Sequence, residues 1–298
     1  MHRRHAALGS LVMTAVVVTG CSGSSTSPSE STPPPAPPPS ATLRAPAVVG
    51  LTAMPTGTAT LTWDSNTSRI SVQIQAIGFT PRSSHAMHLH PGSCADPDPA
   101  PSIAFPDLVA DARGAVLQTV VSGKAPAGIP PGFHLSIHLA PDRQLGAPDD
   151  VAATRVACAD IPSGTPAAGP AVVPLLAPAR QQNTPGATAT VRYDAAAHTV
   201  RTEITASGLL PDSAHAAHIH AGSCAAQGAD VYPLPDIQSD GAGNATSAAT
   251  ITGVMSAPPA TGWYVDVHLG SSDRIRGSDN SPALLFAPIL CGDIRAGG

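Results

Sequence analysis

HAMHLH, residues 85–90, is the stretch on which the rest of the chain depends, and Cys94 follows it four residues later. It returns 130 residues later as HAAHIH, residues 215–220, again followed by a cysteine, Cys224. A later histidine keeps the same offset, because FHLSIH ends at His138 and WYVDVH ends at His268. The sequence therefore contains one histidine-rich element twice, and we expect the remaining residues to form a scaffold that is also built twice.

Strand geometry divides the histidines of the first copy into two groups. Side chains alternate between the faces of a strand, so His88 and His90 point the same way with Cα atoms about 6.6 Å apart. His138, on a later strand, is placed to complete a site of three histidines. His85 has the opposite parity and is interpreted as a structural, hydrogen-bonding histidine. His134 is not expected to be a ligand, because the second copy has tyrosine at that position.

The second copy yields the same assignment, with His218, His220 and His268 as ligands and His215 as the structural histidine. Three imidazoles suit copper or zinc, and copper binds such donors more tightly. Zinc sites usually have a fourth protein ligand or a water. The residues alone thus favour copper, one ion per copy. Two other interpretations stay open: polar decoration of half-buried strands, and a duplicated scaffold that has lost its function.

The composition favours short strands and turns. Apolar residues make up 42% of the 298 residues and aromatic residues only 3%, while there are 33 prolines and 27 glycines. Proline and glycine interrupt helices. The formal net charge is −5, with no cluster of arginine or lysine, so we expect no nucleic-acid partner.

Alternating apolar and polar residues predict a β-hairpin in each copy. The first spans residues 58–76 and the second residues 187–206, each with a polar turn in its middle. Residues 46–49 and 170–173 look like equivalent first strands. The predicted fold is therefore all-β, with two tandem domains at residues 47–161 and 170–295, joined by a linker at 162–169.

The N-terminus predicts export. Residues 1–21 combine Arg3 and Arg4 with an apolar run and end in Val-Thr-Gly-Cys, which resembles a bacterial lipoprotein box with Cys21 as the lipidated residue. An ordinary secretory signal with an incidental cysteine is the alternative. Residues 22–46 are rich in serine and proline and predict an extended stalk. We expect an envelope lipoprotein facing the periplasm or the exterior, in contact with the membrane only through its lipid.

The other four cysteines form one pair in each copy, Cys94 with Cys158 and Cys224 with Cys291. An even number of cysteines in an exported chain is typical of disulfide bonds. We therefore expect both pairs to be oxidised.

Each copy resembles copper/zinc superoxide dismutase over nearly its whole length. The resemblance lies in a Gly-x-x-Pro turn before the histidine strand, the HxxHxH element, the cysteine after it, the late strand ending in histidine, and a final segment containing cysteine. It implies Greek-key β-barrel or sandwich domains, copper on the three histidines, the two disulfides named above, and dismutation of superoxide. Arg155, in TRVAC at residues 154–158, corresponds to the arginine that guides the anion.

The chain departs from this family in the loop that holds zinc. Residues 95–106 and 225–235 contain no histidine, so the bridging and zinc ligands are absent. Asp107 and Asp236 resemble the zinc-ligand aspartate, but we do not expect one carboxylate to hold zinc. Pro288 stands where the second copy should carry the guiding arginine; Arg274 and Arg276 are nearby in sequence, but nothing there places them.

A more distant resemblance is to the CHRD domain, a module of surface proteins that is not known chiefly for catalysis. Two functions therefore stay open. The first is an envelope dismutase acting on superoxide. The second is a non-catalytic protein that binds copper or interacts at the surface. The sequence names no protein partner.

Overall fold

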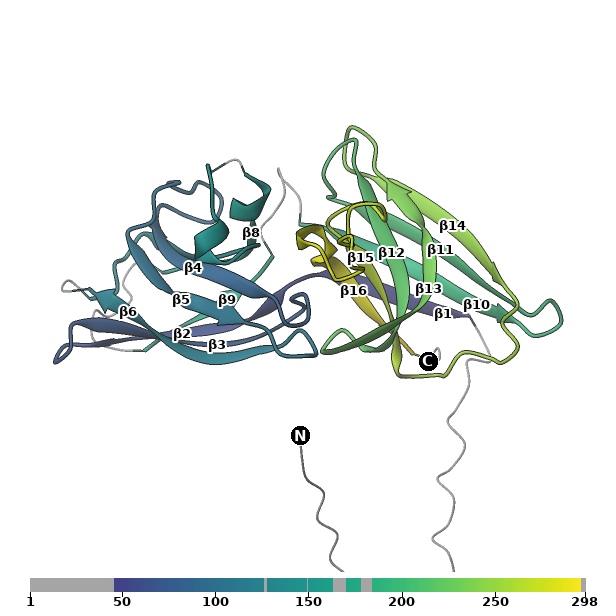
Figure 1. The fold of residues 1–298 in the computed structure, drawn as a ribbon, viewed down its shortest axis with the longest axis horizontal. Helices are drawn as coiled ribbons and strands as arrows, with labels where there is room; N and C mark the ends of the chain where they lie inside the picture. Colours follow the sequence, from purple (N-terminus) through teal and green to yellow (C-terminus); the bar gives the residue numbers. More distant parts are fainter. Residues whose placement is uncertain (1–45, 126–127, 149, 163–169, 178–183, 296–298) are drawn as a thin grey trace, which may run out of the picture. The chain divides into compact units, whose positions relative to one another are not determined.

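The computed structural model describes residues 46–125, 128–148, 150–162, 170–177 and 184–295. The predicted signal peptide, Cys21 and nearly all of the predicted stalk lie outside these ranges. The described residues form sixteen β-strands and three short 3₁₀-helices, with no α-helix (Figure 1). Within these ranges no helix has the length and apolar character that a bilayer crossing requires. The prediction of an all-β fold is confirmed.

Eight strands lie between residues 47 and 160. They are β1 (Ala47–Ala53), β2 (Thr56–Asp64), β3 (Arg69–Ile77), β4 (Ser84–Pro91), β5 (Ile103–Val109), β6 (Val116–Lys124), β7 (Phe133–His138) and β8 (Arg155–Asp160). Eight more follow: β9 (Ala171–Leu175), β10 (Gly186–Asp194), β11 (Thr199–Ser207), β12 (Ala214–Ser223), β13 (Ala226–Gln238), β14 (Ala245–Thr252), β15 (Trp263–His268) and β16 (Pro288–Ile294). The 3₁₀-helices are η1 (Asp142–Gln144), η2 (Val151–Ala153) and η3 (Leu284–Phe286).

The predicted hairpins are present in both copies. β2 pairs with β3 in antiparallel register from Thr56–Ile77 to Asp64–Arg69. β10 pairs with β11 in the same way. In β3, apolar residues alternate with polar ones, and the apolar side chains Ile70, Val72 and Ile74 are fully buried. The period of two thus places one face of each hairpin in the core, as the sequence predicts.

The strands form one eight-stranded sheet and two four-stranded sheets. The large sheet has the order β13-β12-β15-β16-β1-β10-β11-β14 and curves into a nearly closed barrel-like form. The smaller sheets have the orders β6-β3-β2-β9 and β5-β4-β7-β8. In both copies the histidine strand pairs with a strand distant in sequence, β4 with β7 and β12 with β15, which is the crossover of Greek-key arrangements.

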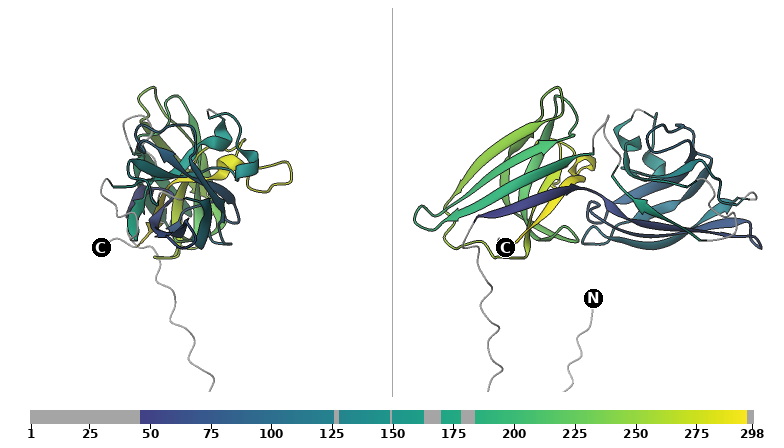
Figure 2. Two further views of the ribbon diagram at one scale, coloured as in Figure 1. Left: turned by 90° about the vertical axis from the view of Figure 1, so that its left-hand side faces the viewer. Right: turned by 180° about the vertical axis from the view of Figure 1, so that it is seen from behind.

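The two predicted first strands exchange places. β1 pairs with β10 and β16, so residues 47–53 belong to the sheet of the second copy. β9 pairs with β2, and Leu176 after it bridges to Cys158, so residues 171–176 belong with the first copy. Figures 1 and 2 show the purple strand β1 lying along the green strand β10. Sequence order and sheet membership therefore differ for these two strands.

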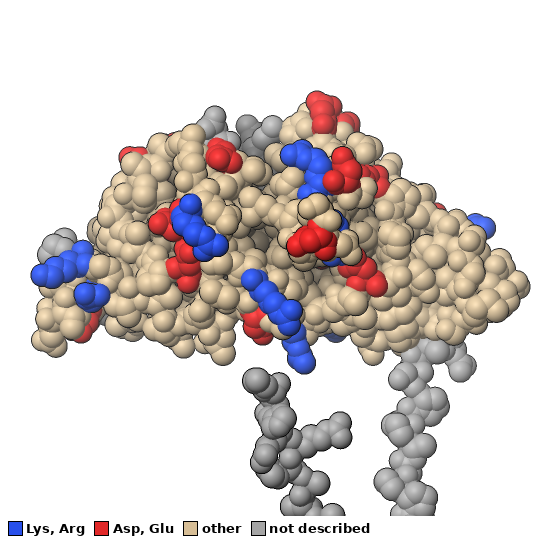
Figure 3. Space-filling model, in the orientation of Figure 1, with Lys and Arg blue, Asp and Glu red and all other residues tan. Residues whose placement is uncertain are grey.

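The apolar side chains of each copy point into its buried core. In the histidine strands these are Met87 and Leu89 in the first copy and Ala217 and Ile219 in the second, all fully buried. The histidines that alternate with them therefore point away from this core, towards the loops. Charged side chains are sparse on the face shown in Figure 3, as expected for a chain with 12% charged residues.

Candidate metal centres

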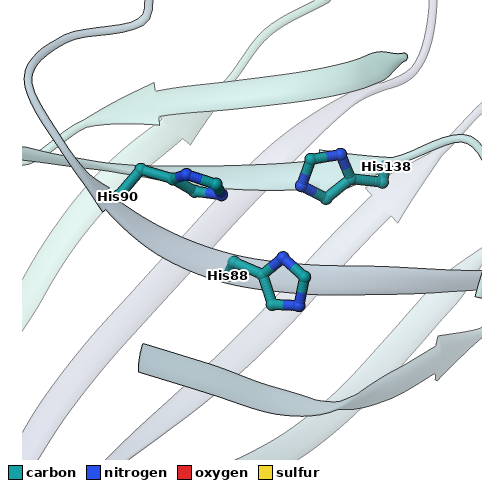
Figure 4. Close-up of side chains that lie close together, drawn as sticks. All are labelled: His88, His90 and His138. Carbon is teal, nitrogen blue, oxygen red and sulfur yellow. The ribbon is translucent and has the colours of Figure 1, made fainter. Parts of the chain in front are cut away.

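Two neighbouring strands bring the first three histidines together. His88 and His90 lie on one face of β4, and His138 ends the adjacent strand β7 (Figure 4). Their ring centroids are 5.1 to 5.7 Å apart, and one nitrogen from each ring lies within 4.8 Å of the others. The three side chains that parity and the later strand single out in the sequence thus form one cluster, here called the first triad.

Hydrogen bonds fix which nitrogen of each ring is free. His90 donates from Nδ1 to the carbonyl oxygen of Asp98 at 3.0 Å, and His138 donates from Nδ1 to that of Ala153 at 2.8 Å. Carbonyls only accept, so these Nδ1 atoms carry the protons and each Nε2 keeps a lone pair. Both Nε2 atoms are buried without a hydrogen-bond partner. Both ring nitrogens of His134 are unpaired as well, but the free nitrogens of His90 and His138 also lie within 4.8 Å of a nitrogen of His88, and this clustering indicates a ligand such as a metal ion.

The ring of His88 has its other nitrogen, Nδ1, free to bind a metal ion. His88 Nε2 lies 3.0 Å from the carboxylate of Asp142, which leaves Nδ1 of His88 as the metal donor. A carboxylate on the distal nitrogen of a ligand histidine orients the ring and increases its basicity. The Asp142 backbone N–H in turn donates to Asp107 at 3.0 Å. Asp107, which resembles the zinc-ligand aspartate, therefore holds the loop that orients His88.

Burial keeps these histidines neutral. Burial, helped by the neighbouring histidines, lowers the pKa of His90 to about 4. Burial also lowers the pKa of His138. Neutral imidazole is the form that binds metals, so no proton has to be displaced from these two rings at neutral pH.

His85 lies outside the triad and supports it. Its Nδ1 donates to the carbonyl oxygen of His138 at 2.8 Å, and its Nε2 contacts the Ser83 hydroxyl. His215 makes the same contact with the carbonyl oxygen of His268 at 2.9 Å. In both copies the first histidine of HxxHxH thus holds the backbone of the late-strand histidine, the structural role expected from its parity.

A cavity of about 490 Å³ opens above the first triad, and Arg155 lines it. The guanidinium donates to the carbonyl oxygen of Cys94 at 3.0 Å, beside the disulfide. Burial lowers the pKa of Arg155, but an arginine stays charged at any physiological pH. Its charge also contributes to the lowered pKa of His138, after burial and the charge of His88. The cavity therefore combines the three imidazoles of the triad and the ring of His134 with one fixed cation, Arg155, and two carboxylates, Asp98 and Asp142.

His134 lies at the edge of the first triad without joining it. Its ring stacks on that of His90 with centroids 5.4 Å apart. In the second copy Tyr264 stacks on His220 in the same way, at 4.9 Å. The position packs against a ligand ring in both copies, which agrees with its exclusion from the predicted ligands.

The second triad has the same frame and different hydrogen bonds. One nitrogen each from His218, His220 and His268 lies within 4.8 Å of the others. His268 donates from Nδ1 to the carbonyl oxygen of Phe286, so its Nε2 accepts a hydrogen bond from Nδ1 of His218 at 3.0 Å. Position 272, which corresponds to Asp142, is serine. Before Nδ1 of His218 can bind a metal ion through its lone pair, the proton on Nδ1 must therefore move to Nε2.

A carboxylate lies beside a different ring in this copy. Nδ1 of His220 donates to the carbonyl oxygen of Gly228 at 3.3 Å and lies 3.1 Å from Asp230, which also pairs with Arg276. The structure thus places Arg276, left unplaced by the sequence, near the second triad. The sequence analysis predicted neither Asp142 nor Asp230. The only indication in the sequence is that Asp142 lies four residues after the ligand His138.

Both disulfides are present, Cys94–Cys158 and Cys224–Cys291, with sequence separations of 64 and 67 residues. Each joins the loop after a histidine strand to the last strand of its copy. Disulfides are typical of extracellular or periplasmic proteins. They agree with export, but the lipid anchor stays a prediction.

A comparison with protein families matches the model of the CHRD domain to residues 164–278. This range contains the second triad but not Cys291. No curated protein matches the chain. The family that the sequence resembles more distantly is thus the one whose model matches, while the resemblance to copper/zinc superoxide dismutase stays a prediction.

Proposed function

We propose that this protein binds copper at both histidine triads, outside the cell membrane and anchored through a lipid on Cys21, and that the first triad removes superoxide. The observation that carries the proposal is the set of buried, unpartnered Nε2 atoms of His90 and His138, with its counterpart on His220. Each points to a ligand that accepts lone pairs, and three imidazoles without a fourth protein ligand favour copper over zinc.

Bound copper would supply a one-electron cycle, taking an electron from one superoxide, released as oxygen, and returning it with two protons to a second, released as hydrogen peroxide. The chain itself contributes the approach. Arg155 presents a fixed positive charge in the first cavity, and a cation beside an open site raises the local concentration of an anion. Since both zinc-loop segments lack histidine, we assign the protons to water.

The first step of the test is metal binding. Copper titrated into the protein is expected to reach two ions per chain, and His88→Ala combined with His218→Ala is expected to abolish tight binding, since each change removes one of three donors. His134→Ala is the matched control and should keep both ions. Unchanged stoichiometry in the double variant would overturn the proposed sites.

The second step is a superoxide assay on the copper-loaded protein. We expect activity above that of copper in buffer, and Arg155→Ala should lower it about tenfold or more while copper stays bound, because the change removes the charge that attracts the anion and none of the three metal donors. Arg155→Lys keeps the charge and should retain more of the rate. Tight binding of two ions without activity would refute the enzyme and leave copper binding intact.

The match to the CHRD domain favours a second candidate, a non-catalytic protein that binds copper or interacts at the cell surface. The matched range covers most of the second copy, and beyond its end Pro288 stands at the position of Arg155. An inactive, fully loaded protein in the assay above is the result that would select this candidate.

A further inference from the structure

The two triads differ in the residue whose carbonyl oxygen accepts a hydrogen bond from the late-strand histidine. His138 donates to the carbonyl oxygen of Ala153, and His268 donates to that of Phe286, so these two residues occupy equivalent positions. Ala153 lines the first cavity. The Phe286 ring lies 4.3 Å from the ring of His268, between centroids, and is 6% exposed. An aromatic ring thus fills the second copy where a methyl group leaves space in the first.

An ion pair lies over this ring. The Arg276 guanidinium stacks on Phe286 with 4.6 Å between its central carbon and the ring centroid. It also pairs with Asp230, whose other oxygen lies 3.1 Å from Nδ1 of His220. Arg276 therefore connects the cover of one ligand ring, His268, with the support of another, His220.

A short hairpin fixes Arg276 in this position. Ala283 N–H donates to the carbonyl oxygen of Ile275 at 2.9 Å, and Gly277 N–H donates to that of Ser281 at 2.8 Å. Ile275 is 2% exposed and belongs to the same buried cluster as Phe286. Movement of Arg276 therefore requires breaking both the ion pair and this packing.

The first triad has no equivalent cover among the described residues that line its cavity. Gly146 and several prolines line the cavity beside Ala153, and Arg155 is the only basic side chain there apart from the histidines. His90 Nδ1 is bonded to a backbone carbonyl, as His220 Nδ1 is to that of Gly228, but no ion pair joins it to a carboxylate among the described residues. Solutes can thus approach the first triad without displacing an aromatic ring or an ion pair.

We propose that Phe286, Arg276 and Asp230 form a cap that closes the second triad, so that this site retains its copper while the first exchanges ions and small anions with solvent. The inference rests on the proposed copper binding and assigns different tasks to the two sites. Phe286 excludes solutes from His268, and Asp230, together with the Gly228 carbonyl, holds His220 with its Nε2 towards the ion. Arg276 is a positioning residue that acts through both.

The test uses two full-length proteins, each with one triad. His88→Ala with His90→Ala leaves only the second triad, and His218→Ala with His220→Ala leaves only the first. Each is loaded with copper and mixed with excess chelator, and azide is added separately as a small anionic probe of the copper electron paramagnetic resonance spectrum. We expect release from the second triad to be at least tenfold slower, and azide to change only the spectrum of the first.

Substitution of the covering residues should reverse the difference in copper release between the two triads. Phe286→Ala with Arg276→Ala should speed release from the second triad at least tenfold and make its spectrum respond to azide. Phe286→Leu, which keeps apolar bulk, should stay slow, and Arg274→Ala in the same loop is the matched control. Ala153→Phe should slow release from the first triad, and it tests the idea even if the uncapped second copy does not fold.

The outcomes separate the two proposals. Copper at neither triad would refute the proposed function and the cap with it. Copper at both triads with equal release rates, or a release rate that Phe286→Ala with Arg276→Ala leaves unchanged, would overturn the cap alone.

Discussion

The first and second triads occupy the same backbone frame and differ in what surrounds them. In each copy, strand parity and register place one nitrogen from each of three imidazoles within 4.8 Å of the others. The loops then give the first triad a cavity with Arg155, and the second a covering ring and an ion pair. The comparison shows that strands decide whether a metal can bind, while loops decide what else can reach it.

The exchanged strands provide the most severe test of this comparison. Val49 in β1 and Val173 in β9 are buried, at 3% and 1% exposure. Val49→Asp should unfold the second triad and spare the first, although residue 49 belongs to the first copy in sequence, and Val173→Asp should do the reverse. An unpaired buried carboxylate costs about 5 kcal/mol, enough to disrupt one copy.

Fluorescence can assign this damage to one copy. The chain has two tryptophans, Trp63 in β2 and Trp263 in β15. Trp63→Phe leaves a reporter in the second copy, and Trp263→Phe leaves one in the first. Val48→Asp is the control, because that side chain is 72% exposed. Loss of the first copy's signal in Val49→Asp would show that β1 pairs within its own copy.

Removal of the disulfides is expected to have the next largest effect, and an equal one in both copies. In the chain-entropy model, loops of 64 and 67 residues each contribute about 4 kcal/mol to the free energy of unfolding. Thermal unfolding of Cys94→Ser with Cys158→Ser, compared with Cys224→Ser with Cys291→Ser, measures this. A loss confined to one copy would contradict the equivalence of the two frames.

Asp142 should matter only to the first triad. Asp142→Asn keeps the shape but replaces the carboxylate at His88 Nε2, so copper affinity there should fall about 10- to 100-fold, or roughly 1.4 to 2.7 kcal/mol. Ser272→Ala, at the equivalent position, is the control and should leave the second triad unchanged. Competition with a chelator of known affinity, in proteins with one triad each, measures both. Equal affinity in Asp142→Asn would remove Asp142 from the site.

The two copies should differ least in how their stability depends on pH. Burial lowers the pKa of both His90 and His220 to about 4, from an ordinary value of 6.5. Since the unfolded chain takes up these protons first, the stability of the metal-free protein is fully present above pH 6.5 and is lost as the pH falls towards 4. Denaturant unfolding of the single-tryptophan variants between pH 7 and 4 should show parallel losses. A copy that kept its stability at pH 4 would not bury its histidines.

The strand pattern of the sequence predicted most of the frame correctly. Alternation gave the hairpins, parity separated His88 and His90 from His85, and the offset of 130 residues brought His138 and His268 into the two triads. These features follow from the fixed period of a strand, which is a local property. They can therefore be read one segment at a time.

The features that the sequence did not predict are side-chain contacts between a loop and a distant strand. Asp142 meets His88 across 54 residues, and Arg276 meets Asp230 across 46. No periodic pattern and no motif in the sequence predicts either contact. The exchange of β1 and β9 was missed for a related reason: both strands have the same alternating pattern, which fits either sheet equally well and does not choose between them.

The position of β1 also determines when this chain can fold during synthesis. β1 is the first strand to be made, but its partner β10 begins at Gly186 and its other partner β16 ends at Ile294. Thr52 meets Cys291 only after 239 further residues, so the second disulfide closes beside the oldest strand of the chain. Such distant pairing is slow to form, and the unpaired edge of β1 is exposed until then. The newly made protein therefore depends on protection of β1 until residue 294 has emerged.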